Sequence, residues 1–294
     1  LLMKRNSVFA VILACVLCLI TGCTSTSNVP PPTIEPTPVV TVQPTESPTE
    51  TPVSELTVHF IDVGQADAAV LQCGDDTMMI DGGNVADSSL IVAYLKKLNI
   101  DNIDYMVCTH AHEDHVGGLS APLSVMPVSA VYAPSAEADS KAYQNFKRKA
   151  ADQNTEIMHP ENYESFPFGS ARVEILACPD NADNLNNTSI ILKVTHKNKS
   201  FLFTGDAERE EEQTLLDRGL LKSDVLKVGH HGSDTSTSYP FLREVMPKYA
   251  VISVGKDNFI RTPYGSRFEP FKGRRCAGVQ NRPARRYNYD KRRR

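Results

Sequence analysis

From residue 56 onward, the chain consists of short apolar runs separated by turns rich in Gly, Asp and Asn. Apolar runs of about four to eight residues between turn residues predict strands, and two runs around Gly74-Asp75 predict a hairpin. The predicted strands are Leu56–Val63, Ala68–Cys73, Thr77–Ile80, Tyr105–Thr109, Ala130–Ala133, Ala171–Ala177, Ser189–Thr195, Phe201–Thr204, Val225–Val228 and Tyr249–Val254.

Helical segments lie between these strands. In the first of them, apolar residues recur at helical spacing, and Asp87 or Ser88 is a suitable N-cap. Each half of the region contains several strands followed by helices, which predicts an α/β fold. We expect two sheets packed face to face with helices outside, a four-layer αββα sandwich over residues 55–258. The predicted helices are Asp87–Leu98, Ser140–Asp152 and Glu208–Leu216.

The first 54 residues have a different composition. Residues 1–22 contain two basic residues, the apolar run Val8–Ile20 and then small residues, a pattern typical of an export signal. The run is too short for a comfortable membrane span. Ile20-Thr21-Gly22-Cys23 resembles a bacterial lipobox, which implies lipid on Cys23 and anchoring to the outer face of the bacterial cell membrane. A cleaved secretory signal without lipid is the alternative. Residues 23–54, rich in Pro, Thr and Ser, predict an extended linker.

The segment Thr109–Gly118 contains the pattern H-x-H-x-D-H, formed by His110, His112, Asp114 and His115. Imidazole nitrogen and carboxylate oxygen are the usual ligands of a catalytic zinc or similar divalent ion. The first three share a face of an extended segment, and a turn would add the fourth. A polar surface loop with chance histidines is the alternative. However, five of the eight histidines lie in two clusters, each after a strand-like run, so we predict a metal site.

Three further candidates also come directly after predicted strands. Asp81 follows the strand that ends at Ile80, Asp206 follows Phe201–Thr204 through Gly205, and His230 follows the strand that ends at Val228. Loops that follow strands can converge on one edge of a sandwich. We therefore expect these residues to lie near the histidine cluster.

Five stretches in this order carry a resemblance to a known family. Together they resemble a metallo-β-lactamase-fold hydrolase and, more narrowly, the extracellular hydrolase domain of ComEC-type competence (DNA-uptake) proteins, over about residues 55–257. The stretches are Phe60-Ile61-Asp62-Val63-Gly64-Gln65-Ala66-Asp67, Met79-Ile80-Asp81-Gly82-Gly83, the histidine cluster, Phe203-Thr204-Gly205-Asp206 and Lys227-Val228-Gly229-His230-His231-Gly232-Ser233.

The resemblance implies a site for two divalent metal ions, Zn or Mn, between which the sequence does not choose. His110 and His112 would hold one ion, and Asp114 and His115 the second. Asp206 would bridge the two, and His230 would complete the second position.

The same resemblance implies supporting or catalytic roles for other residues. Asp114 would also orient the attacking hydroxide or accept its proton, and Asp81 would orient a ligand histidine. Asp67 and His231 are expected in the pocket, where they would bind substrate or protonate a leaving group. Many relatives have a further histidine where this chain reads Asn184–Ser189, and the ComEC-type branch has Asn and Ser there. Water, Asn187 or Ser189 would then fill the first position.

Two residues beside these stretches are expected to have other roles. Cys108 lies within the strand before the histidine cluster, where we expect a small core residue. The cysteines after residue 23 show no paired spacing, so the sequence does not predict a disulfide. His196 lies in the predicted turn His196–Lys199, and we expect it to be exposed.

Residues 259–294 depart from the family pattern. From Arg261 onward there are 12 Lys and Arg residues against two acids, a net +10, which leaves residues 1–260 with 19 basic and 33 acidic residues, a net −14. A basic tail is normally a nucleic-acid or membrane patch. Suitable codons for Phe259–Gly265, read one base later, instead give the family's Tyr-Gly-His-Pro stretch. Our hypothesis is a frameshift after about Asn258, which would leave the tail disordered.

These observations favour an exported metal-dependent hydrolase, a phosphodiesterase or nuclease of the ComEC-type branch. Hydrolysis of a small ester, lactone or β-lactam is the alternative within enzymes. A chain inactivated by a frameshift, or a non-catalytic binding module, is the alternative of another class. We expect no transmembrane channel in this chain, and the acidic residues 1–260 do not favour long-range capture of nucleic acid.

Overall fold

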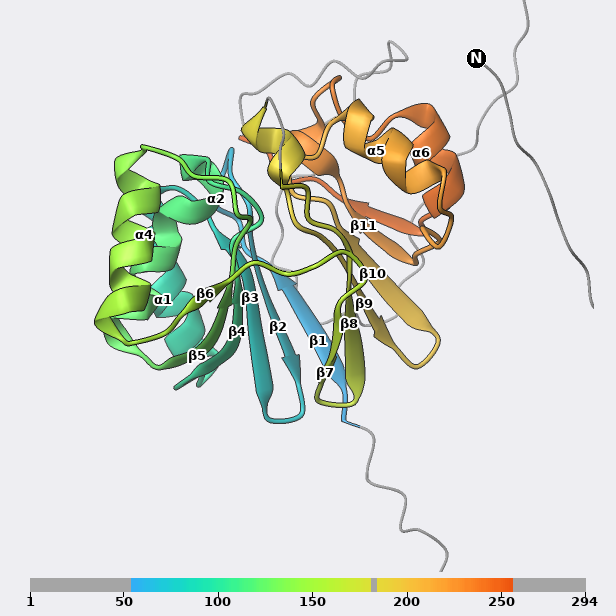
Figure 1. The fold of residues 1–294 in the computed structure, drawn as a ribbon. Helices are drawn as coiled ribbons and strands as arrows, with labels where there is room; N and C mark the ends of the chain where they lie inside the picture. Colours follow the sequence, from blue (N-terminus) through green and yellow to red (C-terminus); the bar gives the residue numbers. More distant parts are fainter. Residues whose placement is uncertain (1–53, 181–183, 256–294) are drawn as a thin grey trace, which may run out of the picture. The chain divides into compact units, whose positions relative to one another are not determined.

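Two six-stranded sheets face each other at the centre of the fold (Figure 1). The computed structural model describes residues 54–180 and 184–255, all within the unit formed by residues 51–294. The predicted export signal, Cys23, nearly all of the predicted linker and the tail 259–294 lie outside the described residues.

The first sheet comes from the N-terminal half of the described chain. Its strands are β1 (Leu56–Phe60), β2 (Ala68–Cys73), β3 (Asp76–Gly82), β4 (Ile103–Val107), β5 (Val128–Tyr132) and β6 (Ile157–Met158). They lie in chain order across the sheet. The pairs β1–β2 and β2–β3 are antiparallel, and β3 to β6 are parallel. The hairpin predicted around Gly74-Asp75 is therefore confirmed.

The second sheet comes from the C-terminal half. Its strands are β7 (Ser165–Phe168), β8 (Ala171–Ala177), β9 (Ile191–His196), β10 (Lys199–Phe203), β11 (Val225–Lys227) and β12 (Tyr249–Val251). They lie in the order β12-β11-β10-β9-β8-β7. Strands β7 to β10 are antiparallel, and β10, β11 and β12 are parallel. Each sheet thus contains parallel strands whose carboxyl ends carry loops.

Helices cover the outer side of each sheet (Figure 1). The helices α1 (Ser88–Lys97), α2 (Glu113–Val116), α3 (Pro122–Val125) and α4 (Lys141–Asp152) follow strands of the first sheet, and α5 (Arg209–Leu216) and α6 (Tyr239–Val245) follow strands of the second. The short 3₁₀ helices are η1 (Val85–Asp87), η2 (Gly117–Ser120), η3 (Leu185–Thr188) and η4 (Gly229–Gly232).

Side-chain alternation along the strands gives each sheet two apolar faces. In β3, Met79 belongs to the cluster with α1 and α4, whereas Met78 and Ile80 belong to the cluster between the sheets. In β10, Leu202 packs with α5 and α6, whereas Phe203 points between the sheets. Each fully buried side chain of this kind contributes about 1.5–3 kcal/mol. Three apolar clusters therefore hold four layers together, and the predicted αββα sandwich is confirmed.

The predicted elements are largely those observed, with bounds that differ by a few residues: β1 and β12 are shorter than predicted, whereas β3, β5 and β10 are longer. Asp87 is the N-cap of α1, but its side chain accepts hydrogen bonds from Asn84 instead of capping α1. Strands β6 and β7 and helices α2, α3 and α6 are not among the predictions. None of the helices within the described ranges is long and apolar enough to cross a membrane.

Cys108 and His196 give one confirmed and one wrong prediction. Cys108 is buried in the core, and it forms no disulfide with another cysteine of the described residues. The expectation that His196 is exposed is wrong, because it is only 9% exposed. Its Nε2 lies 2.8 Å from the Ser54 carbonyl oxygen and 3.2 Å from Ser170 Oγ, since both segments cover the end of β9.

Candidate metal centre

The candidate residues gather at the carboxyl ends of the parallel strands. Asp81 lies at the end of β3, and the histidine cluster follows β4 in the same sheet. Asp206 follows β10, and His230 and His231 follow β11 in the other sheet. The carboxyl ends of parallel strands are the usual position of ligand sites in α/β folds. The two sheets therefore contribute to one common site.

The loop with the histidine cluster is held tightly against β3. The backbone N–H of Gly118 donates to the Gly83 carbonyl oxygen at 3.0 Å. A Cβ atom on Gly118 would lie 2.0 Å from the Gly82 carbonyl oxygen, so a side chain has no room there. This close approach fixes α2, and with it Asp114 and His115, above the end of β3.

Four side chains form a group able to hold a metal ion: Asp114, His115, Asp206 and His231. His115 Nε2 lies 3.2 Å from Asp206 Oδ1, and His231 Nε2 lies 3.1 Å from Asp114 Oδ2 and 3.7 Å from Asp206 Oδ2. Two ligand atoms on a tetrahedral zinc ion are about 3.3–3.6 Å apart, given bond lengths of about 2.0–2.2 Å. The spacing of these atoms therefore fits one divalent ion.

His110 and His112 lie beside this group. His110 Nε2 is 3.0 Å from His112 Nδ1 and 3.9 Å from Asp206 Oδ2. Asp206 thus faces both sets of histidines, one oxygen toward His115 and the other within 4 Å of His110. Its Oδ2 also lies within 4 Å of His230 and His231, so both oxygens of Asp206 lie close to histidine nitrogens.

Two buried atoms in the group have no hydrogen-bond partner. They are His115 Nε2 and Asp206 Oδ1. They lie 3.2 Å from each other without a hydrogen bond, and because an unpaired buried polar atom costs about 1–3 kcal/mol, a bound ion would account for both. The residues present therefore fit a divalent ion with His and carboxylate ligands.

The pKa shifts of His115 and Asp206 also fit a bound cation. Burial would lower the pKa of His115, but the carboxylates of Asp206 and Asp81 outweigh burial and raise it well above its ordinary value. Burial would raise the pKa of Asp206, but His115 holds it well below its ordinary value. The carboxylates therefore favour a positive charge here, as a metal-binding cluster does.

Asp81 supports His115 from behind. Its Oδ2 lies 2.8 Å from His115 Nδ1 and accepts a 2.7 Å hydrogen bond from Thr109 Oγ1, while its Oδ1 accepts from Thr109 N at 2.8 Å. Its backbone has φ 56°, a left-handed conformation that is uncommon outside Gly, Asn and Asp. The side chain fixes the Nδ1–H tautomer of His115 and leaves Nε2 for a ligand, the arrangement expected from the sequence.

His230 and His231 both have positive φ angles, of 48° and 52°, but they differ in burial. His231 is buried and belongs to the group with Asp114 and Asp206, whereas His230 is 28% exposed. His230 Nε2 lies 3.8 Å from Asp206 Oδ2, and its Nδ1 lies 3.0 Å from Thr235 Oγ1. The structure thus brings both histidines close to Asp206, and His231 also lies in the group that could hold a metal ion.

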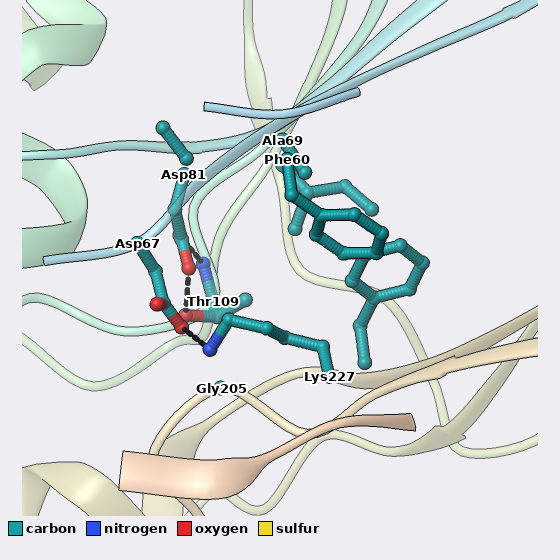
Figure 2. A pocket seen from close by; sticks show the side chains of 10 residues that line it. Phe60, Asp67, Ala69, Asp81, Thr109, Gly205 and Lys227 are labelled. Atoms are coloured by element: carbon teal, nitrogen blue, oxygen red, sulfur yellow. Dashed lines mark hydrogen bonds and ion pairs between the residues drawn. The ribbon is translucent and has the colours of Figure 1, made fainter. Parts of the chain in front are cut away.

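Asp67 lies behind His231, joined to a residue that sequence reasoning missed. The carboxylate oxygen Oδ2 of Asp67 is 2.6 Å from Lys227 Nζ (Figure 2). Its Oδ1 is 3.5 Å from His231 Nδ1. Burial would raise the pKa of Asp67, but the Lys227 ammonium group holds it below its ordinary value. A lysine that interrupts the apolar strand before the His-His pair is the signal that could have identified it.

Asn187 and Ser189 hold the loop that carries Asp206. Ser189 Oγ accepts from Asp206 N at 3.0 Å, and Asn187 Oδ1 accepts from Glu208 N at 2.8 Å. Gly205 has φ 50°, and a Cβ atom there would lie 2.8 Å from Ser189 Oγ. Both side chains are therefore engaged with the backbone around the predicted bridging residue.

A family comparison identifies this arrangement. The model of the metallo-beta-lactamase superfamily matches residues 61–174 and 181–256. The chain belongs to the metallo-β-lactamase superfamily. This superfamily is a hydrolase family, and the chain carries a His/Asp group that could hold a metal ion, so the predicted metallo-hydrolase is confirmed at this level.

Curated relatives carry the narrower resemblance. ComE operon protein 3 of Bacillus subtilis is 29% identical and covers 72% of this chain. Recombination protein 2 of Haemophilus influenzae is 34% identical over 72% of the chain, and competence protein ComA of Neisseria gonorrhoeae is 30% identical over 74%. The chain spans 30%, 26% and 29% of their lengths, respectively. The predicted resemblance to competence proteins is confirmed.

Solved structures give more distant similarities. The metallo-beta-lactamase fold protein YhfI from Bacillus subtilis is 14% identical, with a TM-score of 0.41, and covers 58% of this chain and 69% of its own. The diiron β-hydroxylase CmlA from Streptomyces venezuelae is 15% identical, with a TM-score of 0.46, and covers 70% of this chain and 46% of its own.

Proposed function

We propose that this metallo-hydrolase cleaves phosphodiester bonds, with two divalent ions held between the sheets. The observation that supports this most directly is the group of Asp114, His115, Asp206 and His231, in which two buried atoms lack hydrogen-bond partners. The names of the relatives, which refer to recombination and competence, favour a nucleic-acid substrate. Zinc and manganese both suit these ligands, so metal analysis must choose between them.

In this proposal, the two ions have separate ligand sets that share one carboxylate. His110, His112 and Asp206 would hold one ion. Asp114, His115, Asp206 and His231 would hold the other. Bound ions of this kind supply Lewis acidity and make water acidic enough to attack near neutral pH.

The residues of the chain have different access to a substrate. The Asp114 side chain is 31% exposed, whereas that of Asp206 is 2% exposed. Asp114 is therefore the carboxylate able to orient a water molecule and accept its proton. His230, at 28% exposed, lies at the rim and is placed to contact a substrate oxygen or protonate a leaving group. Asp67 is buried behind His231 and has no such access.

A panel of substrates tests the reaction. The full chain, loaded with zinc or manganese, is assayed on bis(p-nitrophenyl) phosphate and on single- and double-stranded DNA. The same preparation is assayed on a chromogenic β-lactam and a lactone. Faster hydrolysis of the phosphodiesters supports the proposal. Activity on the lactam or lactone alone would establish the alternative of a small-molecule hydrolase.

Asp114→Ala tests the proposed role of that residue. It should reduce phosphodiesterase activity by about 10²–10⁴-fold, the range for loss of a general acid or base. Asp152→Ala is the control, because Asp152 is an exposed carboxylate on α4 whose ion pair within the described part of the chain is with Lys149. If Asp114→Ala retains full activity, the mechanism is wrong.

The non-catalytic alternative has its own test. Purified wild-type chain should retain about two divalent ions per chain, as dinuclear hydrolases do. A chain that retains none would favour a binding module or the product of a damaged gene. The nucleotide sequence decides the frameshift hypothesis, which requires Tyr-Gly-His-Pro and a terminal helix in the next reading frame.

We also propose export and lipid anchoring at Cys23. The support is the sequence of residues 1–23, which lie outside the described part of the chain. In a bacterial host, wild-type chain should incorporate labelled fatty acid and sediment with membranes, and Cys23→Ser should do neither. Membrane association of Cys23→Ser equal to wild type would refute the anchor.

A further inference from the structure

Lys227 is a buried cation between the two sheets. It is the last residue of β11, and its side chain is 6% exposed. Nζ donates to Asp67 Oδ2 at 2.6 Å and to the Val228 carbonyl oxygen at 3.1 Å. Figure 2 shows the side chain extended toward Asp67, next to Thr109 and Asp81. Because a buried ion pair often adds little net stability, its presence requires another reason.

The partner of Lys227 is fixed to the loops of the metal centre. Asp67 N donates to the Asp114 carbonyl oxygen at 3.0 Å, and Asp67 O accepts from Gly83 N at 2.8 Å. Its Oδ1 is buried, lacks a hydrogen bond and lies 3.5 Å from His231 Nδ1. The carboxylate therefore faces the back of the His231 ring.

The orientation of His231 follows from its other contacts. Its Nδ1 lies 3.1 Å from the Ser253 carbonyl oxygen, which can only accept, so Nδ1 carries a hydrogen. The negative charge of Asp67 beside Nδ1 favours the same tautomer. Nε2 is then the nitrogen free to bind an ion, and it faces Asp114 and Asp206.

We infer that Lys227 is a positioning residue of the metal centre, which acts through Asp67 to fix the orientation and tautomer of His231. The inference rests on the proposed metal site. It assigns Asp67 a supporting role in place of a role in proton transfer to substrate. Removal of a carboxylate that orients a metal-binding histidine lowers metal affinity by about 10–100-fold.

Co²⁺ binding by the metal-free full chain tests whether Lys227 positions His231. Co²⁺ affinity and the visible absorption spectrum, which depends on the ligands, are measured for wild type, Lys227→Met and Lys227→Met/Asp67→Asn. We expect Lys227→Met to bind the second Co²⁺ about 10–100-fold more weakly, with an altered spectrum. Lys248→Met is the control, because it breaks a lysine–aspartate contact of the same 2.6 Å on the surface, with Asp224. It should match wild type.

The double variant separates positioning from folding. It removes both buried charges, so its melting temperature should return toward that of wild type. Its Co²⁺ affinity should stay low, because Asn lacks the charge that holds His231. Recovery of both properties would mean that the pair only balances charge, which overturns the inference. Lys227→Met with wild-type affinity would also overturn it. If Lys227→Met does not fold, the double variant decides alone.

Failure of the proposed function can be distinguished from failure of the inference about Lys227. If wild type binds no Co²⁺, the metal site itself is absent and the inference falls with it. If wild type binds two ions and only the Lys227 comparison fails, the proposed function stands.

Discussion

Asp81 and His115 are 34 residues apart in sequence, yet the histidine Nδ1 donates a 2.8 Å hydrogen bond to the carboxylate. Asp81 also accepts two hydrogen bonds from Thr109, the residue directly before the histidine cluster. One buried carboxylate therefore sets both the course of the loop and the orientation of a ligand histidine.

Asp81→Ala should weaken metal binding by about 10–100-fold, because His115 loses the partner that orients it. It should also lower the free energy of unfolding by about 1–3 kcal/mol for each Thr109 donor left unpaired. Asp81→Asn keeps an acceptor and tolerates the left-handed backbone, so its loss of stability should be smaller. Metal content after dialysis and urea denaturation measure the two effects. Unchanged metal content in Asp81→Ala would contradict the role.

Removal of metal should lower the stability of the fold. At an ion concentration about 100 times the dissociation constant, binding stabilises the native state by about 2.7 kcal/mol. For a domain of this size, a chelator should therefore lower the melting temperature by roughly 5–10 °C. Asp206→Ala serves as the control, because it lacks the shared carboxylate and its melting temperature should not respond to chelator. An equal response in both would show that the ions bind elsewhere.

His231→Ala and His230→Ala form a matched pair. Both positions have positive φ, so alanine introduces similar backbone strain at each. Because His231 faces Asp114 and Asp206, its loss should reduce metal content from about two ions to about one. His230→Ala should retain more metal but lose turnover, since its ring is at the rim. The reverse order in metal analysis would return His230 to the role that the sequence argument gives it.

Gly118→Ala should lower the free energy of unfolding by more than about 3 kcal/mol, because its Cβ would collide with the Gly82 backbone. Gly219→Ala is the comparison, since that position has a positive φ of 72° but nothing within 4 Å. Its cost should be about 1–2 kcal/mol of backbone strain. Urea denaturation measures both. Equal costs would mean that the loop can move away from β3 freely.

Much of the fold could be predicted because its strands are short apolar runs between turn residues. The hairpin of β2 and β3 and the helices α1, α4 and α5 all carry such local signals. Helix α6 lacks them, since it follows a run of Ser, Thr and Asp and contains a proline. Ser238 at its N-cap, with Pro240 in the first turn, is the signal that was available. The two-residue strand β6 depends on its neighbour β5 and has no local pattern.

The candidate site, too, could be predicted only in part. The H-x-H-x-D-H pattern and the offset of Asp206 predict which residues gather, because both are read along the chain. Both His230 and His231 are histidines, so the sequence does not reveal which of them is the more buried. Their burial depends on the backbone angles at these two adjacent residues. The partner of Lys227 could not be predicted from its own strand, because Asp67 lies 160 residues away, in the loop directly before β2.

The origin of the ligands in two separate sheets has a consequence for maturation of the protein. The histidine cluster belongs to the first sheet, whereas Asp206 and His231 belong to the second, more than 90 residues later. Neither half of the chain has a complete set of ligands. With the proposed ligands, high-affinity ion uptake must therefore follow docking of the sheets, so the ions would stabilise the assembled sandwich and would not nucleate its folding.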